Sequence, residues 1–266
     1  MRPHFDTIEN TMEELESALY VADRDLAAAL FLAHHLRKPI FLEGEPGVGK
    51  TEVAIALSRL MGADLIRLQC YEGLDASTAL YEWNYPKQLL YIRVLEQKNL
   101  EGEELERRLY SPEFLIQRPL LKAIAYAGSP APVLLIDEID RADEEFEAFL
   151  LELLADFQIT IPEMGTVQAK QYPTVVVTSN RSREVHDALK RRCLYHWIEY
   201  PSPEKEYRII TKKLPDMEGR LAEEITRFMR ELRTLDFYRK PGVAETLDWA
   251  RALMVMHAAY LNDGVV

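Results

Sequence analysis

The chain has 266 residues, 48% of them hydrophobic, and its 44 acidic and 32 basic side chains give a formal net charge of −12. This length favours one large domain, or a large domain with a small companion. The negative charge argues against a protein that holds nucleic acid by bulk electrostatic attraction, and we therefore expect no nucleic-acid partner.

The apolar pattern excludes a transmembrane segment. The longest apolar run covers residues 26–33, whereas a bilayer span needs about 20 residues. The polar N-terminus lacks the apolar stretch of a secretory signal. The sequence therefore predicts a cytoplasmic protein, with peripheral attachment to the cytoplasmic membrane left open.

Helices alternate with short apolar strands over the first 200 residues. Helical spacing predicts two helices within residues 13–36, broken near Ala22 and Asp23, and further helices over 50–61 and 146–157. Continuous apolar runs predict five strands, at residues 39–42, 65–68, 133–136, 174–178 and 193–198. Apolar strands separated by helices indicate an α/β fold with a parallel sheet covered on both faces.

Two segments interrupt this alternation, and a helical region follows it. Residues 71–120 share no single period and predict an insertion of mixed structure, and residues 158–170 predict a hairpin that turns at 162–165. Pro201 and Pro203 mark a linker, after which helices are expected over 204–213, 218–235 and 243–260. We expect a nucleotide-binding core at 1–200 and a small helical lid at 201–266.

The segment from Gly44 to Thr51 matches the complete phosphate-loop pattern G-x-x-x-x-G-K-[ST]. It lies between a predicted strand and a predicted buried helix, as such a loop requires. The expected nucleotide-binding residues are Glu45, Pro46, Gly47, Val48, Gly49, Lys50 and Thr51. Backbone amides and the helix N-terminus would cradle the phosphates of ATP, Lys50 would reach the β and γ phosphates, and the Thr51 hydroxyl would bind Mg²⁺.

Two acidic residues and an asparagine follow apolar strands. The strand at 133–136 ends in Asp137 and Glu138, which is the form of a Walker B segment. Asp137 is the expected metal partner, and Glu138 is the candidate general base that activates water. Asn180 ends the strand at 174–178, where a neighbouring parallel strand would put its amide near the attacking water. An asparagine at a strand end is more often only a turn residue.

These motifs, the basic run at 190–192 and the helical end together resemble the AAA+ ATPases, and within them the MoxR family. The resemblance extends over nearly the whole chain, through the stretches at 20–54, 134–154 and 178–206. The stretch LQCYEGLDASTALYEWNYPKQLL at 68–90 is more specifically similar to the CoxD branch, whose members assist maturation of molybdenum–copper carbon monoxide dehydrogenase.

The resemblance implies an AAA+ P-loop fold with a five-stranded αβα core, ATP and Mg²⁺ as cofactors, and a homo-oligomer, expected to be a hexamer, with nucleotide at the subunit interfaces. It further implies a partner with a von Willebrand factor A domain and a molybdenum hydroxylase as client. One arginine should reach the neighbour's site, and Arg191 and Arg192 both fit that position. Arg141 matches a family position that orders the interface.

One departure from the family concerns the lid. Family members often carry an arginine early in a lid helix that senses nucleotide in the same subunit. The corresponding stretch here, 241–246, has no arginine at the matching place, so Arg239, Lys240 or Arg251 would have to substitute.

Two other functions remain open at this stage. A nucleic-acid-linked or GTP-using motor similar to McrB is disfavoured by the net charge, and a nucleotide-gated scaffold with little turnover is disfavoured by Glu138. Within the insertion, Tyr81, Trp83 and Tyr85 fit either core packing or a client-binding patch. The tip of the hairpin would face the pore of a ring.

Overall fold

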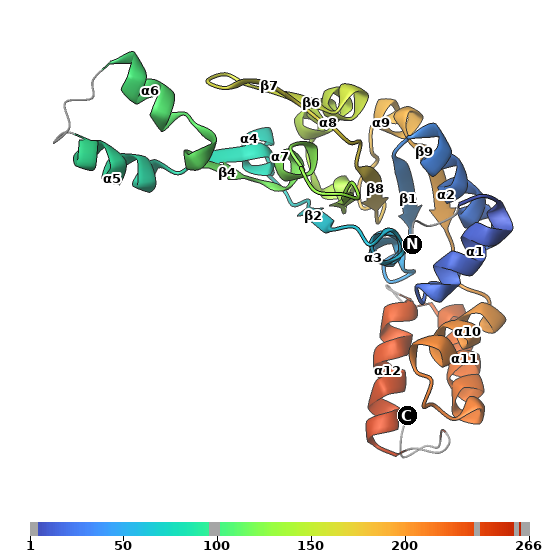
Figure 1. Cartoon of the computed structure of the whole chain (residues 1–266). Helices are drawn as coiled ribbons and strands as arrows, with labels where there is room; N and C mark the ends of the chain where they lie inside the picture. The colour runs from blue at the N-terminus through green and yellow to red at the C-terminus, as the bar shows by residue number, and fades with distance from the viewer. Residues whose placement is uncertain (1–4, 96–101, 237–239, 258–260, 262–266) are drawn as a thin grey trace.

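The computed structural model describes residues 5–95, 102–236, 240–257 and 261 (Figure 1). Five of its strands form one parallel sheet in the order β2-β5-β8-β1-β9. These strands are β1 (Ile40–Gly44), β2 (Leu65–Gln69), β5 (Val133–Asp137), β8 (Thr174–Ser179) and β9 (Leu194–Ile198). The predicted parallel five-stranded core is therefore confirmed.

Alternate residues of the inner strands β1, β5 and β8 enter two separate cores, which explains why these strands are largely apolar. The edge strands β2 and β9 also carry exposed side chains, such as Arg67 and Tyr195. On β5, Leu134 and Ile136 face one core, and Val133 and Leu135 face the other. Helices α7 (Pro119–Ile124) and α8 (Glu144–Asp156) cover the first face. Helices α1 (Ile8–Ser17), α2 (Arg24–Leu36) and α3 (Lys50–Met61) cover the second.

The first helix begins earlier than the apolar pattern predicts. It starts at Ile8 rather than near residue 13, because Thr7 caps it and its hydroxyl accepts a hydrogen bond from the Asn10 N–H at 3.1 Å. The phosphate-loop strand also extends beyond its apolar run to Gly44. Gly44 stays in the ladder because it pairs with Ile198 of β9.

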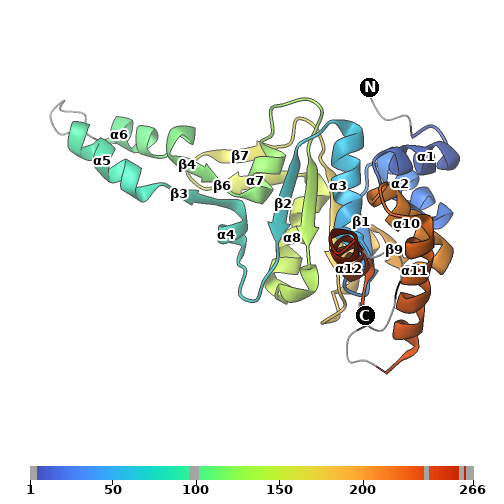
Figure 2. The same ribbon diagram turned by 90° about the horizontal axis from the view of Figure 1, so that it is seen from below.

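The described part of the insertion folds into a projection that we call the arm, residues 81–95 and 102–117. Its base is a two-stranded antiparallel sheet of β3 (Tyr81–Trp83) and β4 (Leu115–Gln117), which α4 (Ala76–Leu80) precedes. Helices α5 (Tyr85–Leu95) and α6 (Glu103–Leu109) lie far from the C-terminal helices in both views (Figures 1 and 2). The 3₁₀ turn at Pro112–Phe114 puts the buried Phe114 ring at the base of the arm.

Two of the three aromatic side chains weighed in the insertion serve packing. Trp83 is buried and Tyr81 packs against the same core, whereas Tyr85 is exposed. After the arm, β6 (Gln158–Ile161) and β7 (Gly165–Gln168) form an antiparallel hairpin. Its second strand begins at Gly165, within the predicted turn at 162–165, because the turn is tighter than the sequence suggests. Ile161 pairs directly with Gly165, whose φ is +85°.

Helices α10 (Pro203–Lys213), α11 (Gly219–Thr234) and α12 (Val243–Val255), here called the lid helices, enclose a third apolar core. The predicted end of the last helix, 258–260, lies outside the described residues. Division of the chain into a core at 1–200 and a lid at 201–266 stays a prediction.

A buried ion pair joins the three lid helices. Arg233 of α11 forms two 2.6 Å hydrogen bonds to the carboxylate of Glu206 on α10, and its Nε donates to the Pro241 carbonyl. The Thr246 hydroxyl of α12 donates to the same carboxylate at 2.7 Å. Because Glu206 is 1% exposed, its charge depends on these partners.

Replacing Glu206 by Gln should destabilise the protein by about 3–5 kcal/mol, because the Arg233 guanidinium would remain buried without its counter-ion. Urea unfolding followed by circular dichroism measures this loss. The control is Arg251→Gln, which breaks the exposed Arg251–Asp248 pair of α12 and should cost no more than about 0.5 kcal/mol. Equal unfolding midpoints for the two variants would contradict the role assigned to the buried pair.

Candidate nucleotide site

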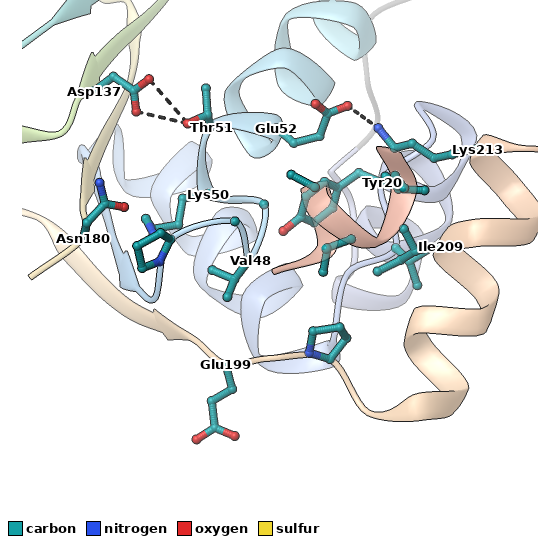
Figure 3. Close-up of a pocket in the computed structure, with 18 of the residues that line it drawn as sticks. Tyr20, Val48, Lys50, Thr51, Glu52, Asp137, Asn180, Glu199, Ile209 and Lys213 are labelled. Atoms are coloured by element: carbon teal, nitrogen blue, oxygen red, sulfur yellow. Dashed lines mark hydrogen bonds and ion pairs between the residues drawn. The ribbon is translucent and has the colours of Figure 1, made fainter. Parts of the chain in front are cut away.

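A cavity of about 730 Å³ lies where the carboxyl ends of the parallel strands meet the lid helices. Its walls are the phosphate loop, the ends of β5 and β8, residues 19–21 before α2, and parts of α10 and α12. In Figure 3, Lys50, Thr51, Asp137 and Asn180 lie on one side, and Tyr20, Ile209 and Lys213 lie across from them. Ligands of open parallel sheets bind at this edge.

The phosphate loop has the curled backbone that its glycines permit. Gly47 and Gly49 have φ values of +78° and +97°, in the left-handed region that residues with a Cβ rarely adopt. Lys50 opens α3, and its ammonium donates to the carbonyls of Gly44 and Glu45, each at 2.7 Å. Burial lowers the pKa of Lys50 to about 8, and the charges of Asp140 and Asp137 oppose this shift.

Most of the predicted nucleotide-binding residues line the cavity. They are Pro46, Gly47, Val48, Gly49, Lys50, Thr51 and Asp137. Glu45 does not line it: its side chain is exposed, and its carbonyl accepts a bond from Lys50.

Asp137 accepts hydrogen bonds from side chains of three different elements. The Thr51 hydroxyl lies 3.1 Å from Oδ1, the Thr178 hydroxyl lies 2.5 Å from Oδ1, and the Arg67 guanidinium lies 2.6 Å from Oδ2. Because Asp137 is 2% exposed, these contacts compensate for its burial. Thr51 and Asp137 are therefore placed to share one metal ion, and hydroxyl and carboxylate oxygens suit a hard cation such as Mg²⁺.

Glu138 also lines the cavity and sits on a strained backbone. Its φ is +57°, which is uncommon for a residue other than glycine. Its N–H donates to the Thr178 hydroxyl at 3.0 Å, and its carboxylate pairs with the Arg141 guanidinium at 2.8 Å. The Thr178 hydroxyl thus contacts both Asp137 and Glu138.

Asn180 reaches the cavity on a loop that Asp140 organises. The Asp140 carboxylate accepts from the N–H of Asn180 at 3.0 Å, and from the N–H and hydroxyl of Ser182 at 2.8 and 2.6 Å. Asp140 is 3% exposed and belongs to the DEID stretch. The sequence analysis did not identify Asp140, Arg67 or Thr178. An acid two residues after the Walker B pair was the available signal for Asp140.

The structure does not bring Arg191 and Arg192 to this cavity. Both lie at the end of α9 (Asp187–Arg192), both are exposed, and neither lines the cavity wall. Arg141, by contrast, does line it.

The lid helices touch the phosphate loop through the main chain. The Gly47 carbonyl accepts from the N–H groups of Val243 and Ala244 at 2.8 and 3.3 Å. Ala244 lines the cavity at the start of α12, within the stretch 241–246 that has no arginine. Close approach explains the glycine at 242, since a Cβ there would lie 2.6 Å from the Gly47 Cα.

The cations that the lid contributes to the cavity come from α10, not from the segment the sequence analysis considered. Lys205 and Lys213 line the cavity and pair with Asp23 and Glu52, respectively. Lys240 is exposed outside it, Arg251 pairs with Asp248, and Arg239 lies outside the described residues.

The two cysteines lie in the packed interior. Cys70 and Cys193 are buried, and burial raises the pKa of each thiol to about 12. Across the described ranges, no cluster of three His, Cys, Asp or Glu side chains could hold a metal ion. The helices seen in these ranges are also too short or too polar to cross a membrane.

Comparison with known proteins identifies related chains. The sequence pattern of the AAA domain (dynein-related subfamily) matches residues 39–193. An uncharacterized protein of Staphylococcus epidermidis is 28% identical over 235 residues, covering 86% of this chain and 79% of its own length. An uncharacterized protein of Staphylococcus aureus is 27% identical over 236 residues, with the same coverage.

Solved structures share the fold. The Holliday junction branch migration motor RuvB of Thermotoga maritima matches with a TM-score of 0.50 and 19% identity, over 97% of this chain and 69% of that one. A protein of Cytophaga hutchinsonii assigned as an ATPase matches with a TM-score of 0.54 and 16% identity, over 94% and 64%. At these identities the likeness establishes the fold alone.

Replacing Gly242 by Ala should weaken ATP binding by about tenfold, because its Cβ would collide with the Gly47 backbone and push α12 off the phosphate loop. Overpacking of this kind costs about 1–3 kcal/mol. Calorimetric titration with a non-hydrolysable ATP analogue measures the change. Gly219→Ala is the control, since its Cβ would meet only the flexible Tyr207 hydroxyl at 3.2 Å. Unchanged affinity in a folded Gly242→Ala protein would contradict the proposed contact.

Proposed function

Because the chain belongs to the dynein-related subfamily of AAA domains and is an ATP-hydrolysing P-loop enzyme, we propose that it is a Mg²⁺-dependent chaperone of the MoxR type. It couples ATP hydrolysis to the remodelling of a client protein. The main support for this proposal is the position of the Thr178 hydroxyl. It forms hydrogen bonds with both Asp137 and Glu138 beside the phosphate loop. We expect the protein to act in the cytoplasm.

The residues around the cavity divide the work of hydrolysis. The amides of the phosphate loop and Lys50 hold the β and γ phosphates of ATP. Mg²⁺, held by Thr51 and by Asp137 directly or through water, would neutralise charge on these phosphates. To bind phosphate, the Lys50 ammonium exchanges its bonds to the Gly44 and Glu45 carbonyls for phosphate oxygens.

Glu138 is the proposed general base. As the water oxygen attacks the γ phosphorus and the bond to the bridging oxygen breaks, Glu138 takes the proton released by the water. The Asn180 side chain orients that water, and Asp140 holds the backbone N–H of the same residue. In the structure Glu138 pairs with Arg141 at 2.8 Å. The carboxylate must therefore exchange this partner for water before it can act.

A second subunit completes the site in this proposal. Members of this family are often oligomeric, and we propose a hexameric ring. Arg191 or Arg192 of one subunit then contacts the γ phosphate bound by its neighbour, where an arginine of this kind accelerates hydrolysis roughly 10³–10⁵-fold. Their exposure outside the subunit's own cavity supports this arrangement.

The arm is the proposed client-binding element. The stretch similar to the CoxD branch, 68–90, forms α4, β3 and the start of α5, which builds the base of the arm. Helix α5 exposes four apolar side chains to solvent, each between 58% and 64% exposed: Tyr85, Leu89, Leu90 and Val94. Exposed apolar side chains on a projecting helix suit binding of another protein. The proposed client is a molybdenum hydroxylase such as carbon monoxide dehydrogenase, assisted by a von Willebrand factor A domain protein.

Replacing Glu138 by Gln should lower kcat for ATP by about 10²–10⁴-fold and leave ATP binding intact, because the amide cannot accept the proton. Lys50→Ala should abolish binding instead. Steady-state turnover and calorimetric titration separate the two effects. An unchanged rate in Glu138→Gln would favour a nucleotide-gated scaffold. Turnover that rises with duplex DNA, or prefers GTP, would favour a nucleic-acid-linked motor.

Client maturation tests the finer proposal. Replacing both Leu89 and Leu90 by Glu should weaken client binding by about tenfold or more, since charged groups would occupy the apolar contact. ATP turnover should persist, because α5 lies far from α3 and α12 (Figure 2), whose residues line the cavity. The measurement is the metal content of a molybdenum hydroxylase co-expressed with each variant and with the von Willebrand factor A domain protein.

The matched control for this test is Leu36→Glu, which alters an exposed leucine of α2 outside the arm. The control should leave metal content unchanged. Full metal loading with the arm variant would reject the arm as the client-binding element, and full loading with Glu138→Gln would reject the maturation role.

A further inference from the structure

A buried carboxylate, Glu43, stands on β1 directly before the phosphate loop and has no part in the scheme above. It is 3% exposed, and β1 lies between β8 and β9, so that Glu43 is in register with Ser179 and Trp197. A buried charge is costly unless it is paired and hydrogen-bonded. Its partners therefore indicate what the residue holds together.

Those partners come from three different elements. The Ser179 hydroxyl of β8 lies 3.3 Å from Oε1, and the Tyr195 hydroxyl of β9 donates to Oε2 at 2.8 Å. The Lys190 ammonium of α9 lies 3.6 Å from Oε2. Burial raises the pKa of Tyr195 to about 12, so this hydroxyl remains a donor at physiological pH. One carboxylate thus ties α9 and β9 to the end of β8.

The contact with Ser179 connects Glu43 to the nucleotide site of the same subunit. The Ser179 hydroxyl also accepts a hydrogen bond from the Arg181 N–H at 3.0 Å. Asn180 lies between these two residues and lines the cavity. Glu43 therefore supports the Asn180 loop from the β1 side, opposite to the support that Asp140 gives.

The contact with Lys190 connects Glu43 to Arg191 and Arg192, which are proposed to act in the nucleotide site of a neighbouring subunit. Lys190, Arg191 and Arg192 are consecutive on α9, so their side chains differ by about 100° of rotation per residue. Lys190 turns inward, with its ammonium 5.9 Å from the centre of the Phe41 ring. Arg191 and Arg192 are exposed. Pairing of Lys190 with Glu43 thus fixes the direction in which both arginines point.

We propose that Glu43 is a positioning residue that sets the rotation of α9, and with it the placement of Arg191 and Arg192 toward the neighbouring subunit. It also links that placement to the Asn180 loop of its own subunit. This inference rests on the proposed function, since it requires an arginine that acts in the neighbour's site. Helix α9 has only six residues, and Leu189 is its one buried residue, which packs in the core that α8 also covers. The Lys190–Glu43 pair is a second point of attachment, and two points fix the rotation of a helix about its own axis.

Mixed assemblies of two inactive variants isolate this role. The acceptor, Arg191→Ala with Arg192→Ala, keeps its phosphate loop but lacks the basic pair. The donor, Lys50→Ala, binds no nucleotide but keeps the basic pair. Mixing them should restore ATP turnover at interfaces where donor arginines face an acceptor site. Light scattering of the mixture with ATP confirms that assembly is unaffected by further changes.

Glu43→Gln is then added to one variant at a time. In the donor it should reduce the restored turnover by about tenfold or more, because a shift of about 1 Å in a catalytic group can cost 10²-fold. In the acceptor, the same substitution should reduce the restored turnover at least about fivefold less than it does in the donor. The donor's own nucleotide site is already inactive. Any turnover that is lost when the donor carries Glu43→Gln must therefore be lost at the neighbouring subunit's site. A general loss of structure would affect both mixtures equally.

Two further donor variants keep the test decisive if Glu43→Gln folds poorly. Lys190→Met should produce the same loss, and combining it with Glu43→Gln should add nothing, because both remove one interaction. Tyr195→Phe keeps the Lys190–Glu43 ion pair and should reduce the restored turnover less than Lys190→Met does.

Equal losses in donor and acceptor, or additive losses in the double variant, would overturn the role of Glu43 alone. A parent mixture that regains no turnover would instead reject the action of the arginines in the neighbour's site, and the role of Glu43 with it.

Discussion

The hydroxyl of Thr178 is the contact on which the arrangement of the site depends. It donates to Asp137 at 2.5 Å and accepts from the Glu138 N–H at 3.0 Å, so it joins the ends of two neighbouring strands through one oxygen. Parallel strands bring their carboxyl ends to one edge, but the ladder itself stops at the Ile136–Val177 pair. Beyond that pair, the Thr178 hydroxyl fixes where the two carboxylates lie relative to the phosphate loop.

The elements that the sequence predicts well have local signals. The inner strands β1, β5 and β8 are buried on both faces and are therefore largely apolar. The phosphate loop needs glycine where φ is positive, as at Gly47 and Gly49. The sequence analysis placed the first helix too late because its start depends on a cap at Thr7 rather than on apolar spacing. Local physics thus determines most of the core and the motif residues of the site.

Residues that support the motifs could not be identified in this way, because their partners are distant in sequence. Arg67 meets Asp137 across 70 positions, Asp140 meets Asn180 across 40, and Glu43 meets Tyr195 across 152. Each looks unremarkable in its own segment, as a charged residue in or after a strand. Only the order of the strands in the sheet brings the pairs together, and short-range patterns do not encode that order.

The lid helices contact the phosphate loop without an arginine from the stretch 241–246. Their direct contact with the phosphate loop is between main-chain groups, from the start of α12 to the Gly47 carbonyl. Such a contact depends on the shape of the loop and carries no full charge, so it responds weakly to the charge that distinguishes a triphosphate from a diphosphate. Within the described ranges, the lid cations that line the cavity are Lys205 and Lys213 on α10, and each is already paired with a carboxylate of the core. A phosphate that attracts either lysine must compete with Asp23 or Glu52, and that competition would loosen the attachment of α10 to the core.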